Sequence, residues 1–216
     1  MKPNCYLRGA CVLFCVGALT LTGSPVMAIE KAKYEVIESD GDFELRQYGK
    51  QIVAETVLEG EFDEVGSEGF RILVDYINGN NRKSESISMT APVSQEALSE
   101  KIPMTAPVTQ ERKGKSWRIT FLMPSTYTLK TLPEPLDERV KLKETQSRIM
   151  AALKYSGTWS RKRYKEKETL LIEMINERGF IQIGVPVWAR YDPPFMPWFL
   201  RRNEVLIPVE RGRQSS

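Results

Sequence analysis

The chain has 216 residues with 31 Lys and Arg, 28 Asp and Glu and no His, which gives a formal net charge of +3. Because the chain has no His, nucleophilic catalysis by Ser, Cys or Thr through a His base is excluded. His-ligated zinc sites and His-ligated haem-iron sites are excluded as well. The nearly balanced charge, with no basic stripe carrying interleaved aromatic residues, also argues against a nucleic-acid partner.

The first 28 residues have the pattern of a cleaved secretory signal peptide. Lys2 and Arg8 are the only charges before Glu30, and an apolar run of 12 residues spans Ala10–Leu21. That run is shorter than the roughly 20 residues of a membrane span, and Val26-Met27-Ala28 fits the cleavage rule loosely. Removal of residues 1–28 would also remove all three Cys, so no disulfide is expected. We therefore expect a periplasmic or secreted protein.

The region after the signal peptide predicts three strands and a helix. Strands are expected at Tyr34–Ile37 and Phe43–Tyr48, joined by a turn at Ser39–Asp42, and a third at Gln51–Leu58. One face of the third strand carries Ile52, Ala54, Thr56 and Leu58. Apolar residues at helical spacing then predict a helix over about 62–78, ended by Asn78-Gly79-Asn80-Asn81; they are Phe62, Val65, Phe70, Leu73, Val74 and Ile77.

The pentapeptide Met-Thr-Ala-Pro-Val follows twice, at Met89–Val93 and Met104–Val108. It contains no group that performs catalysis, so we interpret it mainly as a strand whose Pro lies at an edge or strand end. The second copy is expected to pair beside the first. Alternatively, Met89 or Met104 forms a pocket wall or a soft ligand.

The second half repeats this order of elements. Further strands are expected at Trp117–Met123, Val140–Glu144, Ser147–Tyr155, Gly184–Tyr191 and Glu204–Val209. We expect a helix over about 160–178 whose inward-facing side chains are Tyr164, Leu170, Leu171, Met174 and Ile175.

An offset of 97 residues aligns the two halves, about 34–110 and 117–209, as in Leu45 with Leu142 and Gly60 with Gly157. The expected fold is α+β, with a duplicated strand–helix unit. About eight strands form a distorted, mostly antiparallel, barrel-like sheet with two packed helices. One domain would span residues 29–210, before a disordered tail at 211–216.

Two further segments could bind ligands. After the stiff turn Asp192-Pro193-Pro194, the loop carries Phe195, Met196, Trp198 and Phe199 and then Arg201 and Arg202. These residues could clamp a flat apolar carboxylate, because guanidinium groups bind carboxylates in a bidentate way. Alternatively, the aromatics fold back as a lid on the core and the arginines pair with acids such as Glu204. The run Arg161–Lys167 is either the solvated start of the second helix or an anion site.

Several strings in the chain resemble the SOUL family of haem-binding proteins. They are ISMTAPV, KIPMTAPV, RITFLMPSTYTLKTLPEPLD (Arg118–Asp137), RIMAALKYSGTW (Arg148–Trp159) and YDPPFMPWFLRRNEVLIPV (Tyr191–Val209). The resemblance runs from about Tyr34 to Val209. It implies a distorted barrel built from a duplicated unit, and non-covalent binding of haem or a related tetrapyrrole in a shallow apolar cleft. The binding residues would be Phe70, Arg71, Tyr191, Phe195, Met196, Trp198, Phe199, Arg201 and Arg202.

The sequence departs from an ordinary haem site in two respects. Iron could be ligated only by Tyr191, Met196, water or nothing. The first helix is also acidic, with Arg71 as its lone cation, which suits propionates poorly. We therefore expect apolar contacts to dominate, so that metal-free porphyrin binds about as well as haem.

The leading hypothesis is thus a secreted, non-enzymatic tetrapyrrole-binding protein with no catalytic or metal-ligating residue. The alternative is a general apolar-ligand or protein-interaction module on the same fold. A third hypothesis, hydrolysis by a carboxylate such as Glu55 or Glu173, rests on analogy of fold alone.

Overall fold

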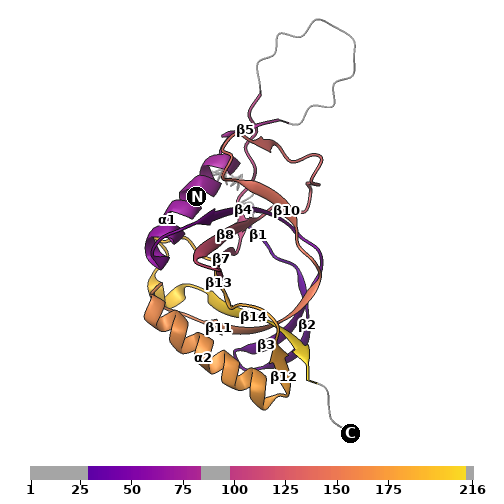
Figure 1. The fold of residues 1–216 in the computed structure, drawn as a ribbon, viewed down its shortest axis with the longest axis vertical. Coiled ribbons are helices and arrows are strands. Elements are labelled where there is room, and N and C mark those ends of the chain that lie inside the picture. The colour runs from indigo at the N-terminus through magenta and orange to yellow at the C-terminus, as the bar shows by residue number, and fades with distance from the viewer. Residues whose placement is uncertain (1–28, 84–97, 213–216) are drawn as a thin grey trace, which may run out of the picture.

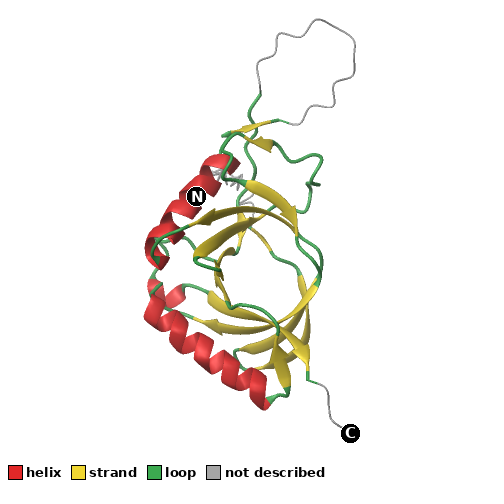
Figure 2. Cartoon of the chain, viewed as in Figure 1, coloured by secondary structure: helices red, strands yellow, loops and turns green. Residues whose placement is uncertain are grey.

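The structure, a computed structural model, describes residues 29–83 and 98–212. One antiparallel sheet curls into a distorted, open barrel, and two helices, α1 (Phe62–Ile77) and α2 (Arg161–Glu177), pack on its outer side (Figures 1 and 2). The expected α+β fold is therefore confirmed. Nine strands follow one another in the sheet in the order β10 (Lys141–Glu144), β4 (Ile52–Leu58), β8 (Ser116–Leu122), β7 (Val108–Lys113), β13 (Val187–Arg190), β14 (Asn203–Arg211), β11 (Arg148–Tyr155), β3 (Phe43–Tyr48) and β2 (Tyr34–Asp40).

Three short pairings lie beside this sheet. β12 (Phe180–Gln182) pairs with β14 in antiparallel fashion. β1 (Glu30–Lys31) pairs in parallel with β6 (Thr105–Ala106), and β5 (Asn81–Arg82) pairs with β9 (Glu134–Pro135). These pairings fix the long connections around the barrel without adding to its wall.

The strands predicted in both halves are present, and β7 is a strand that the sequence did not predict. Its residues, VTQERK, lack a clear alternation of apolar and polar side chains. β7 instead forms a hairpin with β8, and Gly114 at the turn has φ 61°, a conformation that Gly adopts readily. Pairing with neighbouring strands on both sides, rather than local pattern, makes this segment a strand.

The sheet has two different faces, which β3 illustrates. Phe43 and Leu45 point toward the helices and join the main core, which includes side chains of both α1 and α2. The alternate residues, Arg46 and Tyr48 among them, lie on the concave face, where a smaller apolar cluster forms around Met150. The helices thus cover the outer face, and the concave face carries both apolar and charged groups.

α1 lies unusually close to the sheet because glycines face it. A Cβ added to Gly69 would lie 2.8 Å from the Ile119 side chain of β8, and one added to Gly66 would lie 2.7 Å from the Gln110 side chain. Gln110 in turn donates a hydrogen bond to the carbonyl of Phe62 at 2.9 Å. The start of α1 is therefore fastened directly to the sheet.

Both helices begin and end close to the predicted residues, but the inward assignment of Leu170 was wrong, since this residue is 40% exposed. Phe70, which was predicted to bind a ligand, is 36% exposed. Each lies at the margin of its helix's apolar face, next to positions such as Leu171 that are fully buried. Because neighbouring helical residues are separated by about 100°, spacing alone does not decide which of two adjacent apolar residues is covered.

The second pentapeptide copy has a structural position. Thr105 and Ala106 form β6, the Ala106–Pro107 peptide is cis, and Val108 begins β7. Thr105 Oγ1 donates a 2.5 Å hydrogen bond to the Leu122 carbonyl. Met104 is 40% exposed. The first copy, and so the predicted pairing of the two copies, lies outside the described residues.

In both halves a sheet strand precedes a helix, β4 before α1 and β11 before α2. The duplication itself stays a prediction, as does the signal peptide, which lies outside the described residues. β14 includes Arg211, so that residue belongs to the sheet rather than to the predicted tail. Neither helix of the described chain has the length and apolar character needed to cross a bilayer.

Candidate functional site

The loop between β13 and β14, residues 191–202, exposes a group of apolar side chains, and we call it the aromatic loop. Phe195 is 86% exposed, and Trp198 and Phe199 are more than half exposed, as is Leu200. Trp198–Leu200 form a short 3₁₀ helix, in which the Trp198 and Phe199 rings meet edge to face at 5.5 Å. These aromatics do not fold back on the core. They leave several large apolar side chains exposed on one loop.

Arg201 holds the aromatic loop in shape. Its Nε donates a 2.7 Å hydrogen bond to the Met196 carbonyl, and its Nη2 donates to the Pro194 carbonyl. Its guanidinium also lies 4.7 Å from the ring centroid of Trp159, the residue just before the Ser160 N-cap of α2. The N–H donors of Arg201 therefore bind carbonyl groups of the aromatic loop, and its guanidinium holds the loop beside α2.

Arg202 points to the opposite, concave side of the sheet. Its backbone N–H donates to Asp192 Oδ2 at 2.6 Å, and its side chain forms an ion pair with Glu204 at 2.7 Å. A further hydrogen bond of 3.2 Å joins it to the Tyr34 hydroxyl. The two neighbouring arginines thus diverge, and Arg202 has the acidic partner that the second interpretation of this loop expected.

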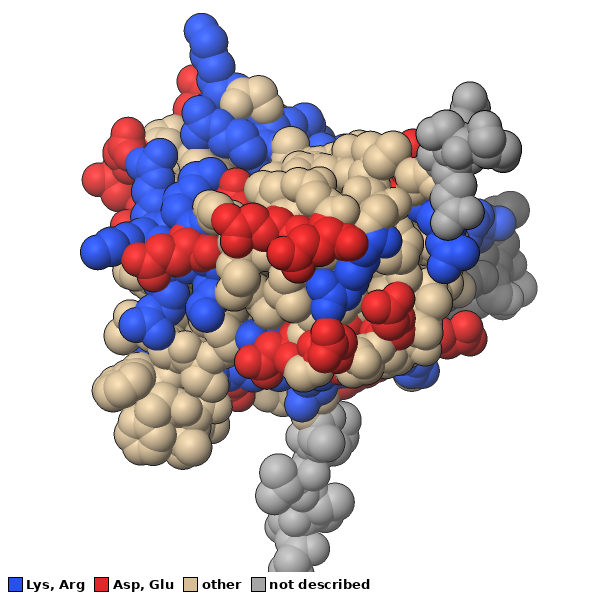
Figure 3. Space-filling model, turned by 90° about the horizontal axis from the view of Figure 1, so that it is seen from below, with Lys and Arg blue, Asp and Glu red and all other residues tan. Residues whose placement is uncertain are grey.

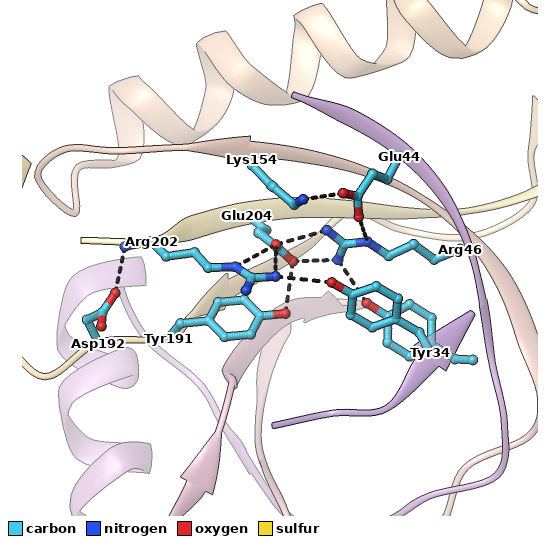
Figure 4. A network of polar contacts seen from close by, with 9 residues as sticks. Tyr34, Glu44, Arg46, Lys154, Tyr191, Asp192, Arg202 and Glu204 are labelled. Atoms are coloured by element: carbon cyan, nitrogen blue, oxygen red, sulfur yellow. Dashed lines mark hydrogen bonds and ion pairs between the residues drawn. The ribbon is translucent and has the colours of Figure 1, made fainter. Parts of the chain in front are cut away.

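Glu204 is the centre of a buried polar network on the concave face (Figure 4). Its carboxylate is fully buried and accepts five hydrogen bonds. Two come from Arg46 at 2.7 and 3.0 Å, two from Arg202 at 3.0 and 2.7 Å, and one from the Tyr191 hydroxyl at 2.9 Å. Burial opposes ionisation, but the hydrogen bonds and charges of Arg46 and Arg202 outweigh it and lower the pKa of Glu204.

The network continues along β3. Arg46 donates to Glu44 at 2.7 Å and to the Tyr48 hydroxyl at 3.0 Å, while Glu44 pairs with Lys154 of β11. Burial raises the pKa of Tyr48 to about 12, although Arg46 acts in the other direction. Each charged group of this network therefore has an oppositely charged partner. The arrangement joins β3, β11 and β14, and leaves no oxygen of Glu204 for a ligand.

This network takes Tyr191 away from the predicted ligand site. Tyr191 is 8% exposed, and its hydroxyl donates to Glu204. Burial and the neighbouring carboxylate raise its pKa well above the ordinary value for tyrosine. Arg46 was not predicted as the partner of Glu204, although a charged residue between the apolar residues Leu45 and Tyr48 of a predicted strand was a usable indication.

The remaining predicted residues lie on α1. Phe70 packs at 5.5 Å from the Phe121 ring, and its edge is open to solvent. Arg71 is exposed and forms no ion pair with any described residue. No hydrogen bond, ion pair or ring contact within the described chain joins these two residues to the aromatic loop. The structure therefore brings together Phe195, Trp198 and Phe199, and leaves Phe70 and Arg71 on a separate element.

Two cavities lie along the sheet. One, of about 570 Å³, is lined by lysines, glutamates and Tyr34. The other, of about 340 Å³, has an apolar floor that includes Met150 and a wall of ion pairs. Glu55 belongs to that wall and pairs with Lys143 and, at 3.5 Å, with Arg118. The Glu55 carboxylate, which would have to reach a substrate in hydrolysis, is thus already paired with two cations. Glu173, the other carboxylate considered for hydrolysis, is exposed on α2.

Comparison with known proteins agrees with the resemblance of the motifs. The family model described as SOUL heme-binding protein matches residues 29–208. The chain is 27% identical over 170 residues to heme-binding protein 1 of Xenopus laevis, covering 78% of this chain and 84% of that protein. It is 26% identical over 195 residues to heme-binding protein 2 of Mus musculus, covering 84% and 91%.

Solved structures show the same fold at low sequence identity. The C-terminal domain of EcmrR superposes with a TM-score of 0.56 and 10% identity, covering 82% of this chain and 98% of that chain. A hydrolase from Listeria innocua gives a TM-score of 0.50 and 12% identity, covering 78% and 92%. These two likenesses concern the fold alone. The family match spans nearly all of the described residues, so the chain belongs to the SOUL haem-binding protein family.

Proposed function

We propose that the protein is a non-enzymatic binder of haem or a related tetrapyrrole that acts in the periplasm or outside the cell. Family membership supports the ligand class, and two relatives carry the name heme-binding protein. The observation that carries the proposal is the aromatic loop. It keeps three large aromatic rings in water, where they are available to a flat apolar ligand.

The side chains of the aromatic loop fit a tetrapyrrole macrocycle. Phe195, Trp198 and Phe199 offer apolar faces of the kind that stack on a planar conjugated ring, and Leu200 extends the surface. Because Arg201 already holds the loop backbone, the ligand need not order it on binding. Binding would then remove apolar area from water on both partners.

The same side chains fit the iron less well. The chain has no His, its Cys lie in the expected signal peptide, and the Tyr191 hydroxyl is committed to Glu204. Of Tyr191 and Met196, the two side chains considered as axial ligands of the iron, only Met196 is left. Of the arginines proposed for the propionates, Arg71 is the one without a hydrogen bond or ion pair to a described residue. We therefore propose that the protein recognises the macrocycle rather than the metal.

Titration with hemin and with metal-free protoporphyrin IX, followed by Soret absorbance, tests this proposal. The two affinities should agree within about threefold, because the iron contributes little. A Phe195→Ser, Trp198→Ser, Phe199→Ser variant should bind both ligands at least about tenfold more weakly, since each buried aromatic contributes roughly 1.5–3 kcal/mol. Ile181→Ser with Ile183→Ser is the matched control, because both residues are exposed and apolar but lie at β12.

Absence of saturable binding at micromolar ligand would contradict the proposal. So would binding that the triple variant leaves unchanged. Hemin affinity more than about tenfold above that of the free porphyrin would show that iron coordination matters, and would refute recognition through the macrocycle alone.

The proposed location has its own test. Expression of the full chain in a bacterial host, followed by mass spectrometry of the periplasmic and cytoplasmic fractions, should find a mature protein that begins at Ile29. An intact amino terminus in the cytoplasm would refute secretion. This outcome is independent of the ligand titration.

A protein-interaction module remains the second candidate, and the same observation favours it. An exposed apolar loop with two ordered aromatics is also typical of a protein-binding hot spot. In that case the triple variant would no longer bind a partner protein that the unmodified protein binds. Neither hemin nor protoporphyrin would show saturable binding.

A further inference from the structure

A second aromatic site lies where the amino-terminal ends of both helices meet the sheet. It is a cleft of about 240 Å³ whose floor consists of Phe62 of α1, Trp117 of β8, Tyr164 of α2 and Trp188 of β13. Ring centroids among these four side chains are 5.1 to 5.7 Å apart. None of the four is more than 5% exposed, so the cleft has a rigid aromatic base.

Two polar groups in this base lack partners. The indole Nε1–H groups of Trp117 and Trp188 are buried, and neither has a hydrogen-bond acceptor among the residues that the structure describes. In contrast, Trp159 donates its Nε1–H to Asn203 Oδ1 at 2.8 Å. A buried N–H group usually has an acceptor, because leaving it unpaired is costly. Both tryptophans line the same cleft, so two unpaired donors belong to the residues of its floor.

The rim of the cleft is basic. Arg112 lies 4.7 Å from the Trp117 ring centroid, and Lys165 lies 6.0 Å from that of Trp188. Arg161, the first residue of α2, has a side chain that is 60% exposed and forms an ion pair of 3.7 Å with Glu61, which is itself 79% exposed. Glu168 is the one acidic residue that lines the cleft, and it pairs with Lys165 at 2.9 Å. The rim therefore keeps a net positive charge.

The position at the start of α2 adds to this charge. The first turn of α2 contains no acidic residue, so its own cations oppose the helix dipole. A bound anion would relieve that repulsion. Figure 3 shows blue Lys and Arg side chains gathered toward the left of the molecule, the side on which α2 begins in Figure 1.

We propose that this cleft binds a small planar aromatic carboxylate of one or two rings. The ring would lie on the aromatic floor, while the two carboxylate oxygens accept hydrogen bonds from the rim cations Arg161 and Lys165. A volume of about 240 Å³ is below the roughly 300–1,000 Å³ of sites for drug-sized ligands, and it is too small for a tetrapyrrole. The site is therefore separate from the aromatic loop and does not rest on the function proposed above.

Nuclear magnetic resonance of the four indole N–H groups, with 2-naphthoate as the probe, gives a direct test. The resonances of Trp117 and Trp188 should shift saturably, while those of Trp159 and Trp198 stay in place, because the first has a protein acceptor and the second lies in the aromatic loop. Neutral 2-naphthamide should bind at least about fivefold more weakly, since it lacks the charge that the rim recognises.

Charge variants test the rim. Arg161→Gln with Lys165→Gln should weaken 2-naphthoate binding about tenfold, whereas the control Lys162→Gln with Lys83→Gln should change it less than about twofold. The control removes the same total charge from exposed positions outside the cleft. Unchanged circular dichroism in both variants shows that folding is intact.

Three results would overturn the proposal. They are no saturable shift at millimolar 2-naphthoate, shifts confined to Trp159 or Trp198, and equal loss of affinity in the cleft variant and its control. Hemin titration of the cleft variant keeps the two sites apart, because it should match that of the unmodified protein.

Discussion

Replacement of Glu204 by Gln should be among the most damaging single changes in this protein. The Glu204 carboxylate is fully buried and accepts five hydrogen bonds, four of them from Arg46 and Arg202. Glu204→Gln keeps the size of the side chain but removes its charge, so both guanidinium groups lose their central counterion. Breaking a buried ion pair in this way costs about 3–5 kcal/mol.

The loss is a substantial fraction of a typical free energy of unfolding of about 5–15 kcal/mol. Arg46 keeps Glu44 as a partner and Arg202 is partly exposed, so we expect the lower end of the range, about 3 kcal/mol. Urea unfolding followed by Trp fluorescence measures it. With a slope near 2 kcal/mol per molar urea, the midpoint should fall by about 1.5 M with the slope unchanged.

Two controls make the result interpretable. Glu173→Gln removes an exposed carboxylate from α2 and should change the free energy of unfolding by less than about 0.5 kcal/mol. Arg46→Met combined with Glu204→Gln should cost less than the sum of the single changes, because each single change leaves the other charge unpaired. A loss below about 1 kcal/mol for Glu204→Gln, or strict additivity of the pair, would refute the central role of this network.

Three further predictions concern pH and packing. The lowered pKa values of Glu204 and Glu44 mean that their stabilising contribution is complete above the unfolded pKa of 4.5 and is lost as the pH falls through the folded values, so urea midpoints should drop on acidification. A midpoint that stays constant down to about pH 3 would count against this. Burial raises the pKa of Tyr48 to about 12 from 10.0, so folding should protect this tyrosine from ionisation and stability should fall as the pH rises from 10 toward 12; tyrosinate absorbance of native and unfolded protein checks it. Gly69→Ala should lower the free energy of unfolding by about 1–2 kcal/mol despite the better helix propensity of Ala, because its Cβ would meet Ile119. The control Ser67→Ala, on the exposed face of α1, should change it by less than about 0.5 kcal/mol. A Gly69→Ala variant that is more stable in thermal unfolding would show that α1 can move away from the sheet.

The fold was predictable because its signals are local. A short run rich in apolar and β-branched residues in β4 and apolar residues at helical spacing in α1 indicate the type of each element without knowledge of its neighbours. β7 escaped prediction because its identity depends on pairing with both β8 and β13 rather than on its own pattern.

The site was predictable only in part, since charge pairing joins residues far apart in sequence. The Pro residues of segment 191–202 predict a loop because they prevent a regular element, but whether its aromatics are exposed or fold back on the core stayed open. Whether Arg202 faces a ligand or Glu204 depends on Arg46, which lies 158 residues from Glu204 along the chain. The cleft at the start of α2 combines five elements, α1, β7, β8, α2 and β13, so no single stretch of sequence indicates it.

The two edge strands of the sheet affect whether the protein aggregates at high concentration. In the strand order β2 and β10 come last, and each pairs with one neighbour among the described residues. β2 has an irregular register between Val36 and Glu38, and it carries Glu35 and Asp40 beside them. Bulges and charges on an edge strand hinder the addition of a strand from another molecule. This edge should therefore resist polymerisation, even while the aromatic loop stays open for a ligand.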